Sequence, residues 1–503
     1  KLLIKVIQKK TAGYDGIPYE FYSTFWPLLS QDFFELTQYT LNDSKHLSYS
    51  QNTSLISLLY KKDDKTLLKN WRPLSLLCCD YKLIAKAISN RLKTVLATLL
   101  DTTQTCGVPG RTMFENLFLT RDVLFYCADK HVNGYLISID QEKAFDKLNR
   151  EFLFKVLARM NFGPTFVDWI KSLYTDNIGH VLVNGYMSTS FNLTRGVKQG
   201  CPLSPLLFSL YIETLSLGIK SDPTIHGIPI PGNKHPVIMQ YADDTTLFLS
   251  ERTKMCNVFA LLTRFERATG STINQDKTKG IFLGQPNMDS SFEKIQWCND
   301  DGLKILGITF FPDYMKTQNY NWSYLIGHLT TELDNHQRRA LSLKGKVLIL
   351  NTIALAQLWH IATVIPLPPW FEKKLNGLLF NFLWGVQGYN PIKRQTVFQP
   401  KDKGGLGLKN PKLQQKALQL KYVQQITDPR KHSDWLYLAR YWLGFHLAPL
   451  HPDWAFLRGN SLPKPDDGSK PKYYDDLYRT FILFQPNDLK WQTSYFYYTL
   501  RSC

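Results

Sequence analysis

Val237–Ser250 reads VIMQYADDTTLFLS, and this stretch decides the fold. Two apolar runs flank Ala242-Asp243-Asp244, which predicts two strands joined by a tight turn that carries two adjacent carboxylates. Gly134–Asp140 (GYLISID) is a further β-rich run, with a carboxylate at its carboxyl end. An Asp-Asp pair alone is more often a solvated turn than a functional site, so the rest of the sequence must decide between these readings.

Three carboxylates at strand ends suit a particular chemistry. Buried or half-buried charges are costly unless cations neutralise them. Asp140, Asp243 and Asp244 offer only oxygen ligands, which hard ions such as Mg²⁺ prefer. Two such ions, about 3.5–4 Å apart, can stabilise both the attacking and the leaving oxygen of a displacement at phosphorus.

Composition excludes several protein classes. The chain has 503 residues with 44% hydrophobic and 14% aromatic residues, so it is not disordered. Its length predicts about two to four packed units. Eight Cys without a close even-numbered framework do not describe a disulfide scaffold.

The net charge of +18 is concentrated in one segment. Between Asn335 and Lys431, 16 Lys and Arg residues stand against three acidic residues, which is +13 of the total. Aromatic residues such as Trp359, Trp370 and Trp384 alternate with these cations, as in grooves that bind phosphates and bases. A solvated basic face remains the alternative.

Val347–Ile365 is apolar enough to raise the question of a membrane span. It contains Asn351, Gln357 and His360, so a buried helix and no membrane contact are expected.

The remaining pattern alternates helices and strands. Helices are predicted at Tyr19–Leu41, after Trp71-Arg72-Pro73 through Leu100, at Glu142–Met160, within Gly200–Leu217 after its initial Gly and Pro, and through most of the chain after about Asn321. Ser54–Tyr60 is a strand candidate, and His180–Leu193 reads as a hairpin that turns at Asn184-Gly185.

Several blocks follow one another in a fixed order around these carboxylates. They are Asp15–Leu29, Trp71–Leu77, Asp140–Asp146 (DQEKAFD), Arg195–Pro205 (RGVKQGCPLSP), Tyr241–Asp244 (YADD), Thr269–Gly280, Leu303–Phe310 (LKILGITF), Phe382–Gly385 and Lys403–Leu408. As an ordered set over about residues 10–430, they resemble the reverse transcriptase region of a LINE-type non-LTR retrotransposon. One block departs from the family pattern: Gln104–Arg111 (QTCGVPGR) stands where Gln-x-Gly-aromatic is usual, so template contacts by Gln104 or Arg111 stay open.

The resemblance implies an α+β fold of the right-hand polymerase type. Residues 1–132 are expected to form the amino-terminal extension and fingers. Residues 133–320 should form the palm, an antiparallel sheet backed by helices, with some fingers elements. Residues 321–431 are expected to form a helical, basic thumb, and 432–503 a carboxy-terminal tail of unknown role.

It also implies roles at the metal site. Asp140, Asp243 and Asp244 are expected to bind two Mg²⁺ ions, with Mn²⁺ as a possible substitute. Lys277 is expected to protonate the departing pyrophosphate, although an ordinary surface lysine is the alternative. Glu142 and Asp146 are read as positioning or helix-start residues and not as ligands.

Five further residues are expected to bind the nucleotide. Phe145 would exclude a ribose 2′-hydroxyl and favour dNTPs, with ordinary core packing as the alternative. Gln199 would lie near the template or the incoming nucleotide, and Gly200 would let the backbone approach the base pair closely. Lys61 and Arg72 would bind the triphosphate, and for Lys61 a solvated loop charge is an equal alternative.

The implied function is an RNA-directed DNA polymerase that extends a DNA primer on an RNA template with dNTPs, as part of target-primed reverse transcription. Expected partners are the RNA template, the DNA primer, the RNA–DNA hybrid and an RNA-binding protein of the element. The expected location is the nucleus, with a cytoplasmic ribonucleoprotein stage. The chain starts at Lys1, so it is expected to begin inside a longer reading frame, and the nicking activity that primes synthesis is expected from sequence outside it.

Two other functions compete with this one. The first is a catalytically silent nucleic-acid-binding relic or domesticated fragment of such an element. The second is a two-metal nuclease, in which Phe145 and the Gly200-Cys201-Pro202 block would have no purpose.

Overall fold

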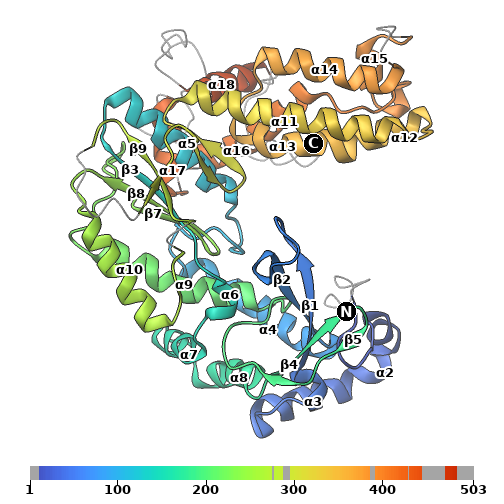
Figure 1. Cartoon of the computed structure of the whole chain (residues 1–503), viewed down its shortest axis with the longest axis vertical. Coiled ribbons are helices and arrows are strands. Elements are labelled where there is room, and N and C mark those ends of the chain that lie inside the picture. Colours follow the sequence, from blue (N-terminus) through green and yellow to red (C-terminus); the bar gives the residue numbers. More distant parts are fainter. Residues whose placement is uncertain are drawn as a thin grey trace.

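The computed structural model describes residues 11–274, 277–286, 295–385, 391–428, 430–443 and 471–483. These parts form a C-shaped molecule around a wide opening, with the palm sheet at its back (Figure 1). The predicted α+β class is confirmed, because a mostly antiparallel palm sheet is covered by helices and the carboxy-terminal half adds a purely helical bundle.

The fingers lie at one side of the opening. Their helices are α2 (Tyr19–Gln38), continued by the π-helical turn η1 (Tyr39–Ser44), α3 (Tyr49–Asn52) and α4 (Cys79–Leu99). Their sheet has the order β2-β1-β4-β5, with β6 also paired to β4. Its strands are β1 (Thr53–Tyr60), β2 (Trp71–Leu76), β4 (Ile178–Val183), β5 (Tyr186–Met187) and β6 (Phe191–Asn192).

The hairpin predicted at His180–Leu193 is confirmed and joins this sheet. Asn184 and Gly185 have φ angles of 50° and 83°, the left-handed pair that a two-residue hairpin turn requires. Its first strand pairs in parallel with β1, with Leu55 beside His180. A segment that follows the first palm strand thus returns to complete the fingers.

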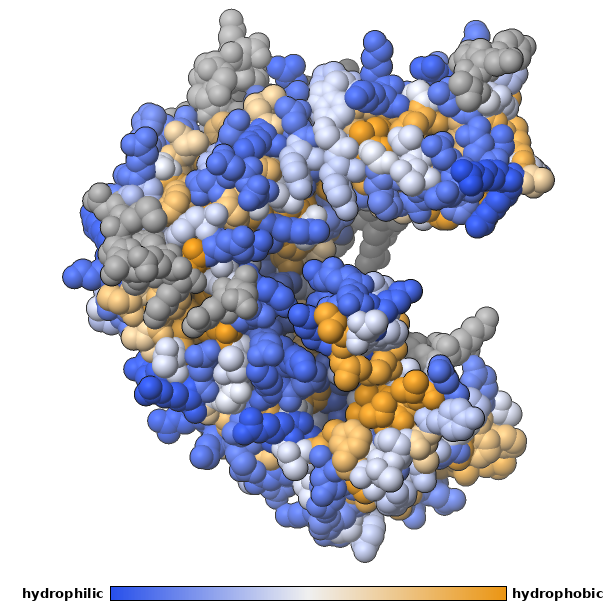
Figure 2. Space-filling model, viewed as in Figure 1, coloured by the Kyte–Doolittle hydropathy of each residue, from blue (hydrophilic) through white to orange (hydrophobic). Residues whose placement is uncertain are grey.

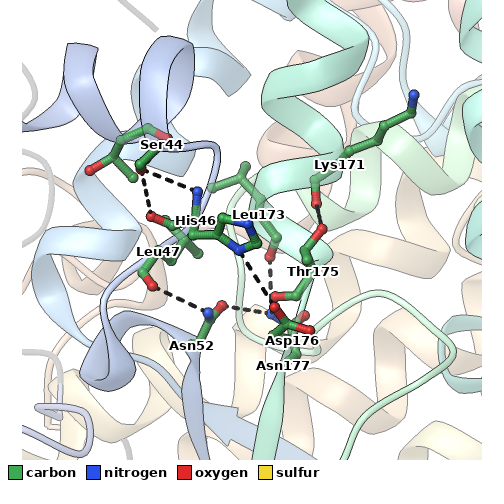
Figure 3. Close-up of polar contacts among 10 residues, drawn as sticks. Ser44, His46, Leu47, Asn52, Lys171, Leu173, Thr175, Asp176 and Asn177 are labelled. Carbon is green, nitrogen blue, oxygen red and sulfur yellow. Dashed lines mark hydrogen bonds and ion pairs between the residues drawn. The ribbon is translucent and has the colours of Figure 1, made fainter.

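Polar contacts join the fingers to the helix that precedes β4, α8 (Pro164–Tyr174) (Figure 3). The buried Asn177 Nδ2 donates to Asn52 Oδ1 at 3.0 Å and to the Leu173 carbonyl at 3.3 Å. His46 Nδ1 lies 3.5 Å from Asp176 Oδ2. These contacts fix the fingers to the palm helices at one end of the opening.

The palm is built on a five-stranded sheet in the order β10-β9-β3-β8-β7. The strands are β3 (Gly134–Ile139), β7 (Ile238–Tyr241), β8 (Asp244–Ser250), β9 (Lys279–Leu283) and β10 (Gln296–Trp297). Every pairing is antiparallel except that of β10 with β9. The two strands predicted around Ala242 are therefore β7 and β8.

Helices cover both faces of this sheet. Residues such as Ile137 and Leu247 pack in one core with α9 (Ser204–Ser221) and α10 (Met255–Thr269). Leu136 and Phe248, which point the other way, pack in a second core with α5 (Met113–Lys130) and the thumb. The hairpin of β11 (Leu303–Ile305) and β12 (Ile308–Phe310) joins this second core.

The single helix predicted at Glu142–Met160 is wrong. The structure has α6 (Ala144–Lys147) and α7 (Arg150–Arg159) instead. Asn149 starts the second helix, since its Oδ1 accepts a hydrogen bond from the Phe152 amide at 3.0 Å. Glu142 stays outside both helices and its amide donates to the Thr272 carbonyl at 2.9 Å.

The thumb is a bundle of helices at the other side of the opening (Figure 1). Its elements are α11 (Tyr314–Gln337), α12 (Leu343–Ile349), the π-helical turn η5 (Leu350–Ala354), α13 (Leu355–Val364), α14 (Pro369–Trp384), α15 (Arg394–Phe398) and α16 (Pro411–Thr427). Among the described residues, Leu343–Val364 is one helix of sufficient length and apolar character to span a membrane, and half of it is buried inside the protein. Its buried side packs against α5, α11, α14 and α16.

The carboxy-terminal tail supplies two further helices. α17 (Asp434–Trp442) packs on α5 and α16, and α18 (Lys472–Leu483) packs on α16. Their side chains Trp435, Trp442, Tyr473 and Tyr474 are buried in the core shared by palm and thumb. Residues 444–470 and 484–503 of the predicted tail lie outside the described residues.

Candidate active site

Two of the three predicted metal ligands lie at the ends of adjacent strands of the palm sheet: Asp140 directly follows β3, and Asp244 begins β8. Ser138 pairs with Thr246 and Ile139 pairs with Thr245, so Asp140 continues the register opposite Asp244. Side chains directly opposite in an antiparallel pair point to the same face. Asp140 and Asp244 therefore share the face of Ser138 and Thr246.

Asp243 lies in the turn between β7 and β8. Tyr241 pairs with Asp244, which leaves only Ala242 and Asp243 to reverse the chain. Ala242 has a φ of 54°, a left-handed conformation that is unfavourable for residues with a Cβ atom. The turn brings the adjacent Asp243 and Asp244 to the same end of the sheet as Asp140.

The three carboxylates repel one another. Burial raises the pKa of Asp243, and the charge of Asp140 raises it further. Asp244 keeps an exposed surface, yet partial loss of hydration, followed by the charges of Asp243 and Asp140, raises its pKa to about 6. The site thus carries negative charge that the surrounding protein offsets only in part.

The donor set fits divalent metal ions. All three side chains offer hard oxygen ligands, and the raised pKa values of Asp243 and Asp244 indicate that a cation would relieve repulsion at this place. In the structure Asp140 Oδ2 faces Lys277 Nζ at 3.4 Å. A metal ion bound by Asp140 Oδ2 would have to displace this lysine.

A different trio is more tightly gathered. Within the described residues, Asp15, Cys78 and Asp80 are the one set of three potential ligands whose atoms all lie within 4.8 Å of one another. Burial raises the pKa of the Cys78 thiol to about 11, and Cys78 Sγ donates to the Ser50 carbonyl at 3.1 Å. A protonated thiol is a poor metal ligand, so this trio does not resemble a metal site chemically.

Two predicted triphosphate ligands act on the same carboxylates. Lys61 follows β1, and Arg72 lies exposed on β2 beside Leu59. The positive charges of both side chains oppose part of the rise in the pKa of Asp243. The charge of Lys61 also opposes part of the rise in the pKa of Asp244. Both cations thus lie within electrostatic range of the carboxylates, as a triphosphate site requires.

The strand end, the turn and the two cations all lie within a segment that matches one known family. Residues 60–310 match the family described as reverse transcriptase (RNA-dependent DNA polymerase). The chain belongs to the reverse transcriptases.

Its curated relatives come from retrotransposons. The chain is 31% identical over 491 residues to the transposon TX1 149 kDa protein of Xenopus laevis, which covers 94% of the chain and 36% of that protein. It is 24% identical to the Pol polyprotein of the type-2 retrotransposable element R2DM of Drosophila melanogaster, over 72% of the chain and 34% of the relative. The chain thus spans about a third of the length of these relatives.

Among solved structures there is a distant likeness to telomerase from Candida tropicalis in complex with a TWJ fragment of telomeric RNA. The identity is 13% and the TM-score 0.40, over 82% of this chain and 68% of that one.

In this reverse transcriptase, Phe145 and Gln199 make protein contacts beside the carboxylates. The half-buried Phe145 ring stacks on Phe208 at 4.8 Å between ring centroids. Gln199 Nε2 donates to Asp146 Oδ1 at 2.9 Å, which joins the motif before α9 to the first turn of α6. Their nucleotide contacts remain predictions.

Gly200 has a structural reason to be glycine. Its φ is 120°, and a Cβ atom there would lie 2.5 Å from the Ser75 carbonyl oxygen of β2. The close approach that the structure shows is therefore to the fingers strand. Contact with a base pair remains a prediction.

Two polar residues of the atypical block Gln104–Arg111 have protein partners. Arg111 Nη1 and Nη2 donate to main-chain carbonyls, including those of Gln104 at 2.9 Å and Leu100 at 2.9 Å, so its guanidinium stabilises the end of α4. Gln104 Oε1 accepts from the Ala242 amide at 3.2 Å, in the turn that carries Asp243. The sequence offered only the position of Gln104 in a family block as a signal for this contact.

The site opens into the wide groove between fingers and thumb. Figure 2 shows mostly hydrophilic side chains on the wall of this groove beside the palm, and apolar side chains gathered on the fingers. The exposed apolar residues of the fingers sheet include Leu59, Leu74 and Tyr186. Polar walls around the carboxylates suit a charged substrate.

Proposed function

We propose that this reverse transcriptase extends a DNA primer on an RNA template with dNTPs, through two divalent metal ions. The observation that carries the proposal is the placement of Asp140 opposite Asp244, with Asp243 in the adjoining turn, inside the segment that matches the family. Three carboxylates at one sheet edge supply the ligands that such a reaction needs.

The residues of the chain have separate tasks in this reaction. Asp140, Asp243 and Asp244 would hold two Mg²⁺ or Mn²⁺ ions, which, when bound, activate the primer 3′-hydroxyl and offset the charge of the triphosphate. Lys61 and Arg72 bind the triphosphate from the fingers. Phe145 excludes the ribose 2′-hydroxyl.

Lys277 is the proposed general acid. Its ammonium lies 3.4 Å from Asp140 Oδ2 and its side chain is largely exposed, so it is free to turn towards a leaving group near the carboxylates. It would donate a proton to pyrophosphate as the bond to the α-phosphate breaks.

In the cell we propose target-primed reverse transcription, with the element's own RNA as template and an element RNA-binding protein as a partner. The retrotransposon origin of the relatives supports this proposal. The nick that provides the primer would come from an endonuclease encoded elsewhere in the element. The proposed location is the nucleus, preceded by a cytoplasmic ribonucleoprotein.

Primer extension tests the polymerase function. A DNA primer annealed to an RNA template is incubated with dNTPs and Mg²⁺ or Mn²⁺, using the full chain, Asp243→Asn and the control Asp168→Asn. Asp168 lies on α8 and pairs with Lys45, far from the chemistry. Extension by the parent and the control, with a loss on the order of a thousandfold in Asp243→Asn, is expected because the variant replaces a charged carboxylate ligand of the metal ions by a neutral amide.

The competing functions give different results in the same assay. A folded parent that binds the hybrid without extending it would establish the silent relic. Metal-dependent shortening of the primer or template, without extension, would establish a nuclease.

A further inference from the structure

The turn that carries Asp243 is strained and needs support from outside its own hairpin. Ala242 occupies a left-handed conformation at φ 54°, where a Cβ atom costs roughly 1–2 kcal/mol. Strained residues of this kind persist only where neighbouring groups determine the backbone. The turn has two residues, so any change at Ala242 moves Asp243 and Asp244 directly.

The support comes from a segment that is distant in sequence. Thr103–Thr105 runs beside β7: the Gln240 amide donates to the Thr103 carbonyl at 2.9 Å, and the Thr105 amide donates to the Gln240 carbonyl at 3.1 Å. This segment therefore acts as an additional short strand at the edge of the palm sheet. It ends beside the turn.

The Gln104 side chain extends this support to the turn. It has no solvent-exposed surface, and its Oε1 accepts hydrogen bonds from the Ala242 amide at 3.2 Å and the Cys106 amide at 3.0 Å. Its Nε2 has no partner among the described residues. Burying the side-chain amide of Gln104 with its N–H donor unsatisfied lowers the stability of the fold. The two hydrogen bonds that its Oε1 accepts must therefore offset this cost.

We propose that Gln104 is a positioning residue of the polymerase: it holds Ala242 in the left-handed conformation and so sets the place of Asp243 and Asp244. The inference rests on the proposed function, and it deepens the account of the same site. Gln104 touches neither substrate nor metal in this role. It acts only through the main chain of the turn.

The experiment is a double-mutant cycle between Gln104→Met and Ala242→Gly. Methionine has nearly the same shape as glutamine but accepts no comparable hydrogen bond, and glycine adopts positive φ without penalty. With Ala242 present, Gln104→Met is expected to lower kcat by about tenfold or more and to raise the Mg²⁺ concentration for half-maximal activity, with little change in KM for dNTP. In the Ala242→Gly background, the effect of Gln104→Met on kcat should shrink to about threefold or less.

A second readout does not depend on activity. Hydrogen exchange of the peptide 238–247 in metal-free protein should be faster in Gln104→Met than in the parent. Thr103→Val is the matched control, because Thr103 lies in the same segment and its hydroxyl contacts Ser216 at 3.1 Å instead of the turn. If Gln104→Met fails to fold, Gln104→Asn replaces it, since the shorter side chain stays polar but cannot reach Ala242.

The outcomes separate the two proposals. Equal losses of kcat in both Ala242 backgrounds, or unchanged exchange of 238–247, would overturn the role of Gln104. If the parent protein does not extend a primer, the proposed polymerase function is wrong. The hydrogen-exchange experiment would still test the contact between Gln104 and Ala242.

Discussion

At the scale of single residues, Lys198 is a charged side chain in an environment that disfavours charge. It lies in the motif before α9, and its buried Nζ has no hydrogen-bond partner in the part of the chain that the structure describes; it lies 4.2 Å from the centre of the Tyr81 ring. Burial lowers its pKa to about 7, against a weaker opposing effect of Cys201. Arg150 lowers the pKa further and Cys78 raises it.

The low pKa of Lys198 predicts a pH-dependent stability. The unfolded chain keeps this proton up to about pH 10.5, whereas the folded protein releases it near pH 7. Between these values the unfolded state binds more protons, so the free energy of unfolding rises with pH. Lys198→Met should unfold with a free energy roughly 1–3 kcal/mol higher at pH 7 and should show a flatter dependence from pH 7 to 9.

Denaturant unfolding at several pH values measures this effect, with Lys155→Met as a control on the exposed surface of α7. A Lys198→Met protein less stable than the parent at pH 7 would show that the ammonium is stabilising where it lies.

Phe145 allows a prediction about substrate choice. If its ring excludes the 2′-hydroxyl, Phe145→Ala should lower the ratio of kcat/KM for dNTP over rNTP by at least about tenfold, because the clash disappears. The same ring also packs on Phe208, so the variant loses stability in either case. Phe152→Ala, which removes a half-buried ring that packs on Tyr211 in the same core, is the control. If the two variants have the same selectivity for dNTP over rNTP, Phe145 does not exclude the 2′-hydroxyl and only packs in the core.

The sequence predicted some residues of the site better than others. Asp140 and Asp244 follow from short strands and alternation, which are local properties, so their common face could be anticipated. The bond from Ala242 to Gln104 joins residues 138 positions apart and depends on how two segments pack. Gly200 was predicted to be glycine because a base pair would lie close to it. The structure shows that the Ser75 carbonyl of the fingers already excludes any larger residue there.

At the scale of elements, α18 joins the palm through a buried polar cluster. Tyr474 Oη donates to Asp122 Oδ2 at 2.5 Å and accepts from Arg121 Nη2 at 3.2 Å, and all three side chains are buried. Arg121 also donates to the Val364 carbonyl of the thumb at 2.7 Å. One cluster thus connects α5, α13 and the tail.

Tyr474→Phe should therefore destabilise the whole chain. The variant leaves Asp122 buried with one fewer hydrogen bond, which costs about 1–3 kcal/mol in the free energy of unfolding. Thermal and denaturant unfolding measure the change, and Tyr324→Phe on the exposed side of α11 is the control. An unchanged midpoint for Tyr474→Phe would show that α18 is not part of the cooperative fold.

The tail illustrates why some elements escape prediction from sequence. Nothing local in Lys472–Leu483 indicates a partner, since Asp122 lies 352 positions away from Tyr474. The break between α6 and α7 was missed for a local reason. Apolar periodicity continues through Asn149, and only the capping bond of that residue starts a new helix.

At the scale of the whole molecule, the net positive charge is concentrated in the thumb, on one side of the opening. The segment Asn335–Lys431 carries +13 of the net +18 and corresponds to the thumb helices from the end of α11 to just beyond α16. Figure 1 shows α11 and α12 on the side of the thumb that faces the fingers, and α14 on the opposite side. A duplex held in the opening would therefore meet only part of this charge.

Because of this arrangement, we expect only the cations on the side of the thumb that faces the fingers to contribute to the salt dependence of binding. Each phosphate contact contributes about 0.9 to the slope of log K against log salt concentration, because binding releases a counterion. Arg338→Gln/Arg339→Gln, two exposed cations at the end of α11, should lower the slope for an RNA–DNA hybrid by about 1 to 2. Lys373→Gln/Lys374→Gln removes the same charge from exposed positions of α14 and should leave the slope nearly unchanged. Equal slopes for the two double variants would mean that only the net charge of the thumb matters, whereas no change in either would make the basic segment a solvated surface without a role in binding.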